Sequence, residues 1–296
     1  MFLVIFILMV FLLLGCSEVE DKMLFADDYR VFRNTPAWNL AVAVEDGDTF
    51  AIKRELLRNP DLINYQEPMY GNSLLMMTVR RQKKYEYLST PLNTIVPVRR
   101  SQIRSFKFLL THGANPNLQG IVVGETALML ACVNRWNDQL FIEELLKHKA
   151  DPNIVGKDTP NGSGGTALQY ACASSIDFVR ILLDNGADVN IRKCGNSVLL
   201  LLLESHDYET SMYLISRGFD CNAPIGYENG RPISILSKLR KDFVKLGSCE
   251  HKKKQELIKL LSNKGIDYYQ EPIPQEAIEF AQKTYSDRWR NYLDEY

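Results

Sequence analysis

The sequence has few of the residues that catalysis and covalent cross-linking require. Six cysteines and four histidines are spread over 296 residues, whereas a disulfide-stabilised scaffold is shorter and richer in cysteine. The motifs of serine hydrolases, phosphate-binding loops and zinc proteases do not occur in it. Its 35 basic and 36 acidic residues leave a formal net charge of -1, so no overall field attracts nucleic acid or an anionic lipid surface. The composition therefore disfavours both an enzyme and a nucleic-acid-binding protein.

The four histidines show no catalytic or metal-binding arrangement. His112 and His148 occupy equivalent positions of a string that recurs along the chain, and His206 and His251 are isolated. If the string marks a stacked repeat, His112 and His148 lie about one repeat apart, which is too far to share a zinc ion. We predict no catalytic residue, no metal site and no cofactor.

The apolar run at residues 2–14 is too short to span a bilayer as a helix, which needs about 20 residues. Its length suits the hydrophobic core of a secretory signal peptide. The run ends in Leu14, Gly15 and Cys16, and an acidic stretch follows. This ending resembles the bacterial lipobox, and the resemblance implies cleavage before Cys16 and attachment of lipid to its sulfur. Two or three acyl chains hold a protein at a membrane without a spanning helix.

Two features depart from the lipobox pattern. No lysine or arginine precedes the apolar run, and Leu14 stands where alanine or serine is more usual. The alternative is an uncleaved apolar leader in which Cys16 is incidental. Because Ser17 rather than aspartate follows the cysteine, the resemblance favours the outer membrane of a bacterial envelope, with the protein facing the periplasm. We therefore predict a signal peptide over residues 1–15 and a lipidated tether over residues 16–34.

Two strings recur through the rest of the chain. The first joins a leucine pair to a short polar link, a small or apolar residue, Asp or Asn, and a further Asn. It starts at the following positions, the first three being the clearest: Leu109, Leu145, Leu182, Leu56, Leu214 and Leu260. The second string joins glycine to Thr or Ser and a short apolar run, and it occupies residues 124–132, 164–172, 71–75 and 195–199. Such regular self-similarity predicts a repeat architecture.

Both strings resemble the ankyrin repeat, whose unit is about 33 residues long. The resemblance covers Trp38 to Asp267, and it implies stacked helix-turn-helix units joined by short β-hairpin fingers. Because one unit cannot bury its apolar face alone, stacking supplies the core. We predict an all-α ankyrin-repeat solenoid of about six repeats over residues 35–270. An amphipathic capping helix is predicted over residues 271–296, since an open end of the stack would expose core.

Several residues of the two strings have predicted roles at helix ends. Side-chain oxygens at the start of the first helix of a repeat can cap its free N–H groups, and these residues are Ser73, Thr126, Thr166 and Ser197. Glycines after the second helix can adopt the left-handed conformation that ends it, and these are Gly113, Gly186, Gly218 and Gly265. Lys149 replaces this glycine in the third repeat, and we expect a local loss of stability there.

The cysteines after Cys16 have two predicted environments. Cys132 and Cys172 hold equivalent positions of the second string, which predicts two buried thiols. Cys194, Cys221 and Cys249 fall in fingers and an insertion. Cys194 and Cys221 are the better candidates for a bridge in an oxidising envelope, and five cysteines leave at least one unpaired.

The resemblance also implies where a partner binds. Ankyrin domains bind proteins through finger tips and exposed residues of the first helices, which together form a concave surface. Carried over to this sequence, the helix positions are Glu45, Asp46, Arg80, Arg81, Val133, Asn134, Ala173, Ser174, Glu204 and Ser205. The finger positions are Gly120, Lys157, Arg192, Lys193 and Tyr227. Their mixed polarity suits a folded protein better than a polyanion, so we predict a protein partner, no nucleic acid and a monomeric chain.

These features together predict a membrane-anchored, protein-binding scaffold or inhibitor in the bacterial envelope. A sharper form of the hypothesis is an immunity-type protein that neutralises a toxin delivered to the periplasm. One alternative is an envelope structural or stress-protection protein without a toxin partner. The other is an enzyme formed by the insertions within the repeats.

Overall fold

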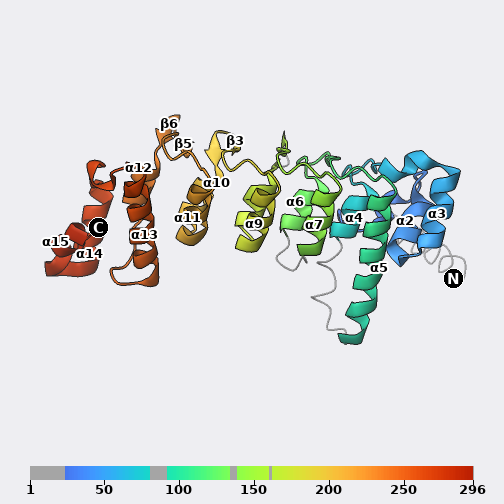
Figure 1. The fold of residues 1–296 in the computed structure, drawn as a ribbon, viewed down its shortest axis with the longest axis horizontal. Coiled ribbons are helices and arrows are strands. Elements are labelled where there is room, and N and C mark those ends of the chain that lie inside the picture. The colour runs from blue at the N-terminus through green and yellow to red at the C-terminus, as the bar shows by residue number, and fades with distance from the viewer. Residues whose placement is uncertain (1–23, 81–91, 134–138, 160–161, 296) are drawn as a thin grey trace, which may run out of the picture. The chain divides into compact units, whose positions relative to one another are not determined.

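The computed structural model describes residues 24–80, 92–133, 139–159 and 162–295. The chain divides into two compact units, Met1–Gly164 (unit 1) and Gly165–Tyr296 (unit 2). Each unit is built from pairs of short helices, and the described hairpins lie at one end of those helices (Figure 1).

Unit 1 contains three helix pairs within its described residues. They are α2 (Trp38–Asp46) with α3 (Thr49–Arg58), α4 (Leu74–Arg80) with α5 (Leu92–Thr111), and α6 (Ala127–Val133) with α7 (Gln139–Lys147). The 3-10 helices η2 (Tyr29–Phe32) and η3 (Pro60–Asn64) precede and follow the first pair. An antiparallel hairpin joins β1 (Asp158–Thr159) to β2 (Gly162–Ser163), with Asp158 opposite Ser163.

Unit 2 continues the same alternation. Its pairs are α8 (Ala167–Cys172) with α9 (Ile176–Asp184), α10 (Val198–Glu204) with α11 (Tyr208–Ser216), and α12 (Ile235–Arg240) with α13 (Cys249–Asn263). Two antiparallel hairpins separate the pairs, β3 (Arg192–Lys193) with β4 (Asn196–Ser197), and β5 (Gly226–Glu228) with β6 (Arg231–Ile233). The chain then forms η5 (Tyr268–Gln270), α14 (Gln275–Tyr285), η6 (Ser286–Arg288) and α15 (Trp289–Glu295).

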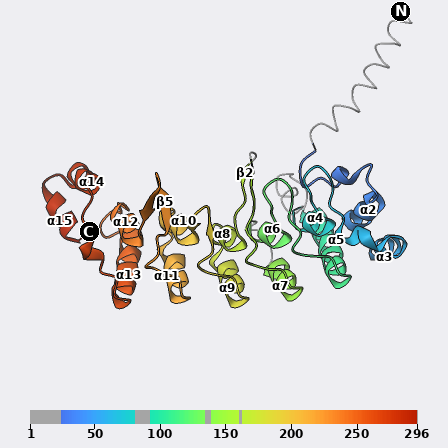
Figure 2. The same cartoon turned by 90° about the horizontal axis from the view of Figure 1, so that it is seen from above.

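The first and second helices of the pairs form two separate rows within each unit. In unit 1, α4 and α6 lie in one row and α5 and α7 in the other (Figure 2). Helix α6 is almost wholly buried, since every residue from Ala127 to Cys132 is buried. Helices this short are marginal in isolation, so packing against neighbouring pairs stabilises them. Phe106 of α5 and Phe141 of α7 form one such contact, with ring centroids 4.6 Å apart.

The recurring asparagine of the first string joins neighbouring repeats. Asn117 Oδ1 accepts the backbone N–H of Asp151 at 2.8 Å, and Asn117 Nδ2 donates to the Lys149 carbonyl at 3.0 Å. In unit 2, Asn190 repeats both bonds, to the N–H of Asp220 and the carbonyl of Gly218. The asparagine therefore recurs because its amide satisfies backbone groups of the next repeat.

The predicted caps of the first helices are confirmed at three positions of four. Thr166 accepts the N–H of Gln169 in a reciprocal capping box, and Ser73 and Thr126 each accept from the backbone three residues later. The prediction for Ser197 is wrong, because its side chain makes no cap hydrogen bond. Its hydroxyl donates instead to the Ile225 carbonyl at 2.8 Å, which ties this position to the next hairpin.

Part of the predicted tether is folded. Within residues 24–34, Tyr29 and Phe32 are buried in unit 1. The Tyr70 hydroxyl donates to the Leu24 carbonyl at 2.6 Å, which fixes the start of this segment. The predicted signal peptide and residues 16–23, including Cys16, lie outside the described residues. No helix in the part of the chain that the structure describes has the length and apolar character needed to cross a membrane.

The C-terminal segment forms two helices where the sequence predicts one. The chain turns at Ser286, which has a φ of 44°, so α15 folds back onto α14. Tyr285 and Tyr292 stack with ring centroids 4.7 Å apart, and Tyr292 is fully buried with Ala277 and Ala281. The aromatic residues of this segment therefore pack against one another, and the break arises because a two-helix cap buries them better than one helix would.

Lys149 supplies a test of the repeat pattern. It adopts a φ of 66° at the helix end where Gly186 adopts 85° in the fourth repeat. A left-handed conformation costs a non-glycine residue about 1 kcal/mol or more. Lys149→Gly is therefore expected to raise the free energy of unfolding by about 0.5–1 kcal/mol, measured by urea denaturation. The matched change Gly186→Lys, where an added Cβ meets nothing within 4 Å, should lower it by a similar amount. A fall in the free energy of unfolding for Lys149→Gly together with a rise for Gly186→Lys would contradict the assignment of Lys149 to the glycine position of the repeat.

Candidate protein-docking surface

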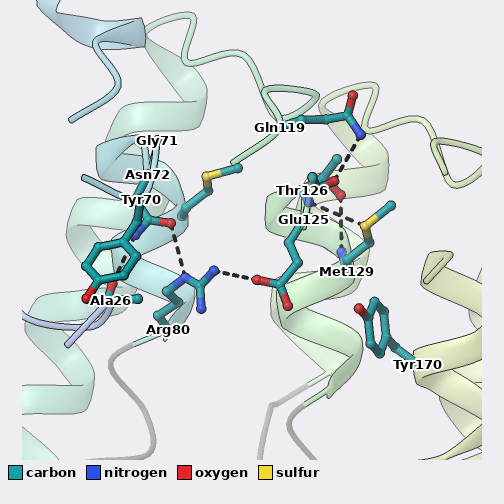
Figure 3. A network of polar contacts seen from close by, with 12 residues as sticks. Ala26, Tyr70, Gly71, Asn72, Arg80, Gln119, Glu125, Thr126, Met129 and Tyr170 are labelled. Atoms are coloured by element: carbon teal, nitrogen blue, oxygen red, sulfur yellow. Dashed lines mark hydrogen bonds and ion pairs between the residues drawn. The ribbon is translucent and has the colours of Figure 1, made fainter. Parts of the chain in front are cut away.

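In unit 1, the chain's own N-terminal segment lies against the side chains of the second repeat. Asn72 donates to the Ala26 carbonyl at 3.1 Å and accepts from Arg80 Nε at 3.2 Å. Arg80 in turn pairs with Glu125 at 2.5 Å, and both side chains are about one-fifth exposed. This polar chain, drawn in Figure 3, links the N-terminal segment to α4 and to the residues that precede α6. Arg80, a predicted partner contact, is thus held by unit 1 itself.

A hollow of about 330 Å³ lies beside this polar chain. Its lining combines part of the N-terminal segment with residues of the second and third repeats, namely Phe25, Ala26, Asp27, Val79, Arg80, Glu125, Leu130 and Val133. The structure therefore brings together two predicted site residues, Arg80 and Val133. It also places the chain's own residues 25–27 on the surface where a partner was predicted.

The other predicted residues of unit 1 lie apart from this hollow. Glu45 is half-buried and Asp46 exposed at the end of α2. Lys157 is exposed in a finger, where its backbone N–H donates to the Val123 carbonyl at 2.8 Å. Gly120 is buried, so it offers no surface to a partner. Arg81 and Asn134 lie outside the described residues.

Unit 2 contains a larger groove of about 830 Å³. One wall is a face of α10 with Asn196 of β4, the second is the β5–β6 hairpin, and the third is α12 with the residue that follows it. The lining residues are Asn196, Leu200, Glu204, Tyr227, Glu228, Asn229, Arg231, Pro232, Ile233, Ser237, Lys238 and Lys241. We call this surface the unit 2 groove.

The aromatic wall of the unit 2 groove is fixed by its neighbours. The Tyr227 side chain is 52% exposed, and its backbone N–H donates to Asn196 Oδ1 at 3.3 Å. An added Cβ at Gly195 would lie 3.0 Å from the Tyr227 ring, so the ring rests against the neighbouring hairpin. Apolar Leu200 and Ile233 line the groove beside it. An exposed aromatic ring that already rests on a neighbouring hairpin loses little entropy on binding.

The charged residues of the unit 2 groove form loose ion pairs. Lys238 lies 3.7 Å from Glu204, and Lys241 lies 3.8 Å from Glu228. Both distances exceed the 2.7–2.9 Å that is typical of a charge-assisted hydrogen bond. Arg231 is exposed, and within the described residues it makes no ion pair. The rim is thus polar while the lining also contains apolar residues, which is the usual anatomy of a protein interface.

The predicted site residues of unit 2 only partly converge. Glu204 and Tyr227 line the groove. Ser205 ends α10 and donates its hydroxyl to the Leu201 carbonyl at 3.1 Å. Arg192 donates its guanidinium to the Pro224 carbonyl, which ties its hairpin to the next one. The remaining predicted residues stand away from the groove lining: Ala173, Ser174 and Lys193.

Several lining residues were not predicted. Leu200 lies one helical turn before Glu204 and shares its face, because residues four apart on a helix are neighbours. Helical spacing could therefore have identified it. Pro232 and Arg231 stand on a hairpin strand, and Lys241 follows the end of α12. No periodic signal in the sequence marks such loop positions.

A cluster of buried charged residues lies next to the groove but not in its lining. Asp242 is 6% exposed, and its carboxylate contacts His206 Nε2 at 2.6 Å and accepts the Tyr208 hydroxyl. Lys254, which is 1% exposed, donates to the Asp242 carbonyl at 2.8 Å. Burial lowers the pKa of Lys254 to about 7, and the nearby Asp242 charge opposes this shift. The cluster joins α11, α12 and α13.

Arg240 completes this cluster from the end of α12. Its guanidinium lies 3.9 Å from the centroid of the Tyr268 ring, and it donates to the Tyr268 carbonyl at 3.3 Å. Burial raises the pKa of the Tyr268 hydroxyl well above its usual range. The cluster thus holds two buried cations against one carboxylate, and its contacts serve to join the fifth and sixth repeats.

The thiols and histidines form neither a bridge nor a metal site in the described residues. Cys194 and Cys221, the candidate pair, are not joined by a disulfide. His112 and His148 each bond the carbonyl four residues earlier through Nδ1, both at 2.8 Å, as expected of equivalent repeat positions. No group of three or more His, Cys, Asp or Glu side chains is arranged to hold a metal ion among the residues described.

Comparison with known proteins agrees with the helix pairs and hairpins. The family model described as ankyrin repeats (3 copies) matches residues 97–193 and 136–225. Residues 97–225 form ankyrin repeats. The predicted all-α ankyrin-repeat fold is thereby confirmed. Ankyrin repeats are in general protein-interaction modules without enzymatic activity, and no enzyme family is indicated for this chain.

Relatives occur in viruses and in animals. The chain is 28% identical over 261 residues to the ankyrin repeat protein FPV031 of Fowlpox virus (strain NVSL), with 81% of this chain and 68% of that protein covered. It is 34% identical over 127 residues to ankyrin repeat and SOCS box protein 6 of Homo sapiens, covering 40% of this chain and 29% of that protein. It is 36% identical over 104 residues to the transient receptor potential cation channel subfamily A member 1 of Homo sapiens, covering 34% of this chain and 8% of that protein. The chain therefore spans about two thirds of the viral relative and less than a third of the two human ones.

Proposed function

We propose that this ankyrin-repeat chain is a protein-binding scaffold that acts as a monomer and docks its partner in the unit 2 groove. The observation that carries the proposal is the groove itself, in which an exposed and fixed Tyr227 stands beside apolar Leu200 within a charged rim. Aromatic anchors in such settings supply much of the binding energy of protein interfaces.

Unit 2 is a better docking surface than the corresponding part of unit 1. In unit 1, Asn72 holds the Ala26 carbonyl, and the hollow beside Arg80 is lined by the chain's own residues 25–27. A partner would have to displace this segment and separate Arg80 from Glu125. Separating a half-buried ion pair leaves both charges partly desolvated, which is unfavourable. Among the residues that the structure describes, no comparable segment lines the unit 2 groove.

Affinity capture with matched variants tests this proposal. The full chain, with and without Tyr227→Ala, is used as bait in extracts of the cells that make it. Loss of an aromatic anchor costs about 2 kcal/mol or more, so we expect the partner's affinity to fall about thirtyfold. Tyr269→Ala is the control, because Tyr269 is 64% exposed in unit 2 but does not line the groove. Equal capture by both variants and the unaltered chain would refute the proposed surface.

We further propose that Cys16 anchors the scaffold to a membrane of a bacterial envelope, facing the periplasm. The support is the sequence, in which the apolar run at residues 2–14 ends at Gly15 and Cys16. An acidic stretch follows immediately and marks the start of the exported part. Lipid chains on Cys16 would hold the chain at the membrane with about 0.8 kcal/mol per buried methylene.

Metabolic labelling with an alkyne fatty acid tests the anchor. Label on the unaltered chain and its complete loss in Cys16→Ala are expected. Cys249→Ala serves as the control and should keep the label, because Cys249 is an exposed cysteine far from the apolar run. Label that persists in Cys16→Ala would contradict lipidation at this residue. An unlabelled chain that still fractionates with membranes would favour the uncleaved leader instead.

The identity of the captured partner decides between two forms of this function. An immunity-type role, motivated by a lipid tether on a binding scaffold, requires that the partner be a toxin delivered to the periplasm. Cells that lack the protein should then be killed by that toxin, and Tyr227→Ala should fail to protect them. A resident envelope protein as partner, with deletion altering membrane or oxidant sensitivity, would support the structural or stress-protection role.

A further inference from the structure

We infer that the unit 2 groove accepts an acidic segment of the partner protein, in which carboxylates flank one aliphatic or aromatic side chain. The inference rests on the proposed function and names the chemistry of the partner. Its first basis is charge. The groove is lined by Arg231, Lys238 and Lys241 against Glu204 and Glu228, a surplus of one cation in a chain whose formal net charge is -1.

The neighbouring hairpin enlarges this surplus. Arg192 and Lys193 form β3, and the backbone of β4 is hydrogen-bonded to the segment entering β5 through Ser197 and Ile225 at 2.8 Å. The two hairpins therefore form one continuous finger surface with cations on both members. A segment that crosses from the groove onto β3 meets lysine and arginine along its path, so electrostatic complementarity selects carboxylates.

The existing ion pairs leave Lys241 accessible and Lys238 partly so. Lys241 is 55% exposed and Lys238 is 25% exposed, and their partners Glu228 and Glu204 are 68% and 53% exposed. Ion pairs at the surface contribute little to stability, so an incoming carboxylate can replace or share these loose pairs with little loss. Arg231 makes no ion pair within the described residues, and its planar guanidinium suits a carboxylate in a two-point contact.

The apolar lining sets the second requirement. Leu200, Ile233, Tyr227 and Pro232 line the same groove as the cations, and Tyr227 is held by Asn196 and the Gly195 backbone. An aliphatic or aromatic side chain entering here is removed from water, which favours binding. The combination therefore fits an acidic peptide segment.

Peptide selection followed by affinity measurement tests this inference. The full chain is immobilised, short random peptides are selected on it by display, and enriched peptides are measured by fluorescence polarisation. We expect peptides with several Asp or Glu residues around one apolar side chain. Their affinity should fall about tenfold to a hundredfold in the combined variant R231E, K238E and K241E. The affinity of the unaltered chain for these peptides should rise as ionic strength is lowered.

The control variant carries the same charge change on α13 and on the residue that follows it. K252E, K259E and K264E together should leave the affinity within about twofold, because these exposed lysines do not line the groove. Circular dichroism of both variants verifies that each is folded. A misfolded combined variant is replaced by the single change R231E, which alters an exposed side chain and should still weaken binding.

Several results would overturn the inference. Enrichment of neutral or basic peptides would exclude the acidic segment, and so would equal binding of acidic peptides to the groove variant and the unaltered chain. Competition by poly(dT) as effective as that by the peptide would identify a general polyanion surface. If partner capture depends on Tyr227 but not on the three cations, the docking surface stands and the acidic segment does not. If capture depends on neither, the proposed function falls as well.

Discussion

Replacing Asp242 by alanine is expected to lower the free energy of unfolding by about 3–5 kcal/mol at a pH below 7. Asp242 carries the negative charge that acts on buried Lys254, on which Arg240 acts as a second cation. Removing one partner of a buried ionic cluster leaves the other charges uncompensated in a medium of low polarity, which is strongly destabilising. The same change removes the acceptor of the buried Tyr208 hydroxyl, and an unsatisfied buried donor adds to the loss.

Urea denaturation of the full chain measures this effect. Glu256→Ala is the control, because Glu256 is an exposed carboxylate on α13, the helix that carries Lys254; it should change stability by less than about 0.5 kcal/mol. Asp242→Asn keeps an acceptor for the Tyr208 hydroxyl, so its loss of stability should lie between those of Asp242→Ala and Glu256→Ala. A loss below about 1 kcal/mol in Asp242→Ala would show that the cluster behaves like a surface ion pair.

The second large effect concerns the pH dependence of stability. Burial lowers the pKa of Lys254 to about 7 in the folded chain, from an ordinary value of 10.5. Between these values the unfolded chain binds more protons than the folded chain does. The free energy of unfolding therefore rises with pH through this interval, and below about pH 7 the burial penalty of the charged ammonium is present in full. The surrounding groups are Asp242, Arg240, Tyr268, Tyr208 and His206.

Lys254→Met isolates this contribution, because methionine fills similar space and does not titrate. The difference in free energy of unfolding between the unaltered chain and Lys254→Met should rise by about 2 kcal/mol from pH 7 to pH 9, at about 1.4 kcal/mol per pH unit. Burial raises the pKa of the Cys172 thiol and of the Tyr268 and Tyr292 hydroxyls. These groups titrate mainly at higher pH. Because both chains contain them, their contributions to the pH dependence of stability largely cancel in the difference.

Lys259→Met is the matched control for this measurement. Lys259 is exposed on the same helix as Lys254, so its replacement should leave the pH profile of stability unchanged. A flat difference between the unaltered chain and Lys254→Met from pH 7 to pH 9 would contradict the lowered pKa of Lys254 in the folded chain.

The repeat fold could be predicted because each repeat uses the same residues for the same physical tasks. The leucines that recur at helical spacing become the buried faces of the helix pairs, and Thr126 and Thr166 cap helices as their positions indicate. Ser197 departs from this pattern because its hydroxyl finds the Ile225 carbonyl of the next hairpin. A tertiary contact of this kind leaves no trace in the local pattern.

The docking surface could be predicted only in part. Tyr227 and Glu204 were identified from their repeat positions, whereas Arg231, Pro232 and Lys241 stand on hairpin and turn positions without periodicity. The folded segment at residues 24–27 lies on unit 1 through contacts with Tyr70 and Asn72, residues 46 positions away in sequence. Only the fold brings such groups together.

The buried cluster was not predicted either. Lysine, arginine and aspartate are almost never fully buried unless paired, so a sequence pattern assigns Lys254 and Asp242 to the surface. Asp242 and Lys254 are 12 positions apart, one after the end of α12 and the other within α13. Their pairing depends on how the inserted residues between them fold.

A photoreactive amino acid at position 227 provides the most direct test of the docking surface. The full chain carrying it is irradiated in the presence of the captured partner, and cross-linked products are identified by mass spectrometry. A chain with the same group at position 269, also an exposed tyrosine of unit 2, is irradiated in parallel. Cross-links to the partner from position 227 and none from position 269 are expected. Cross-links from position 269 alone, with none from position 227, would contradict docking in the unit 2 groove.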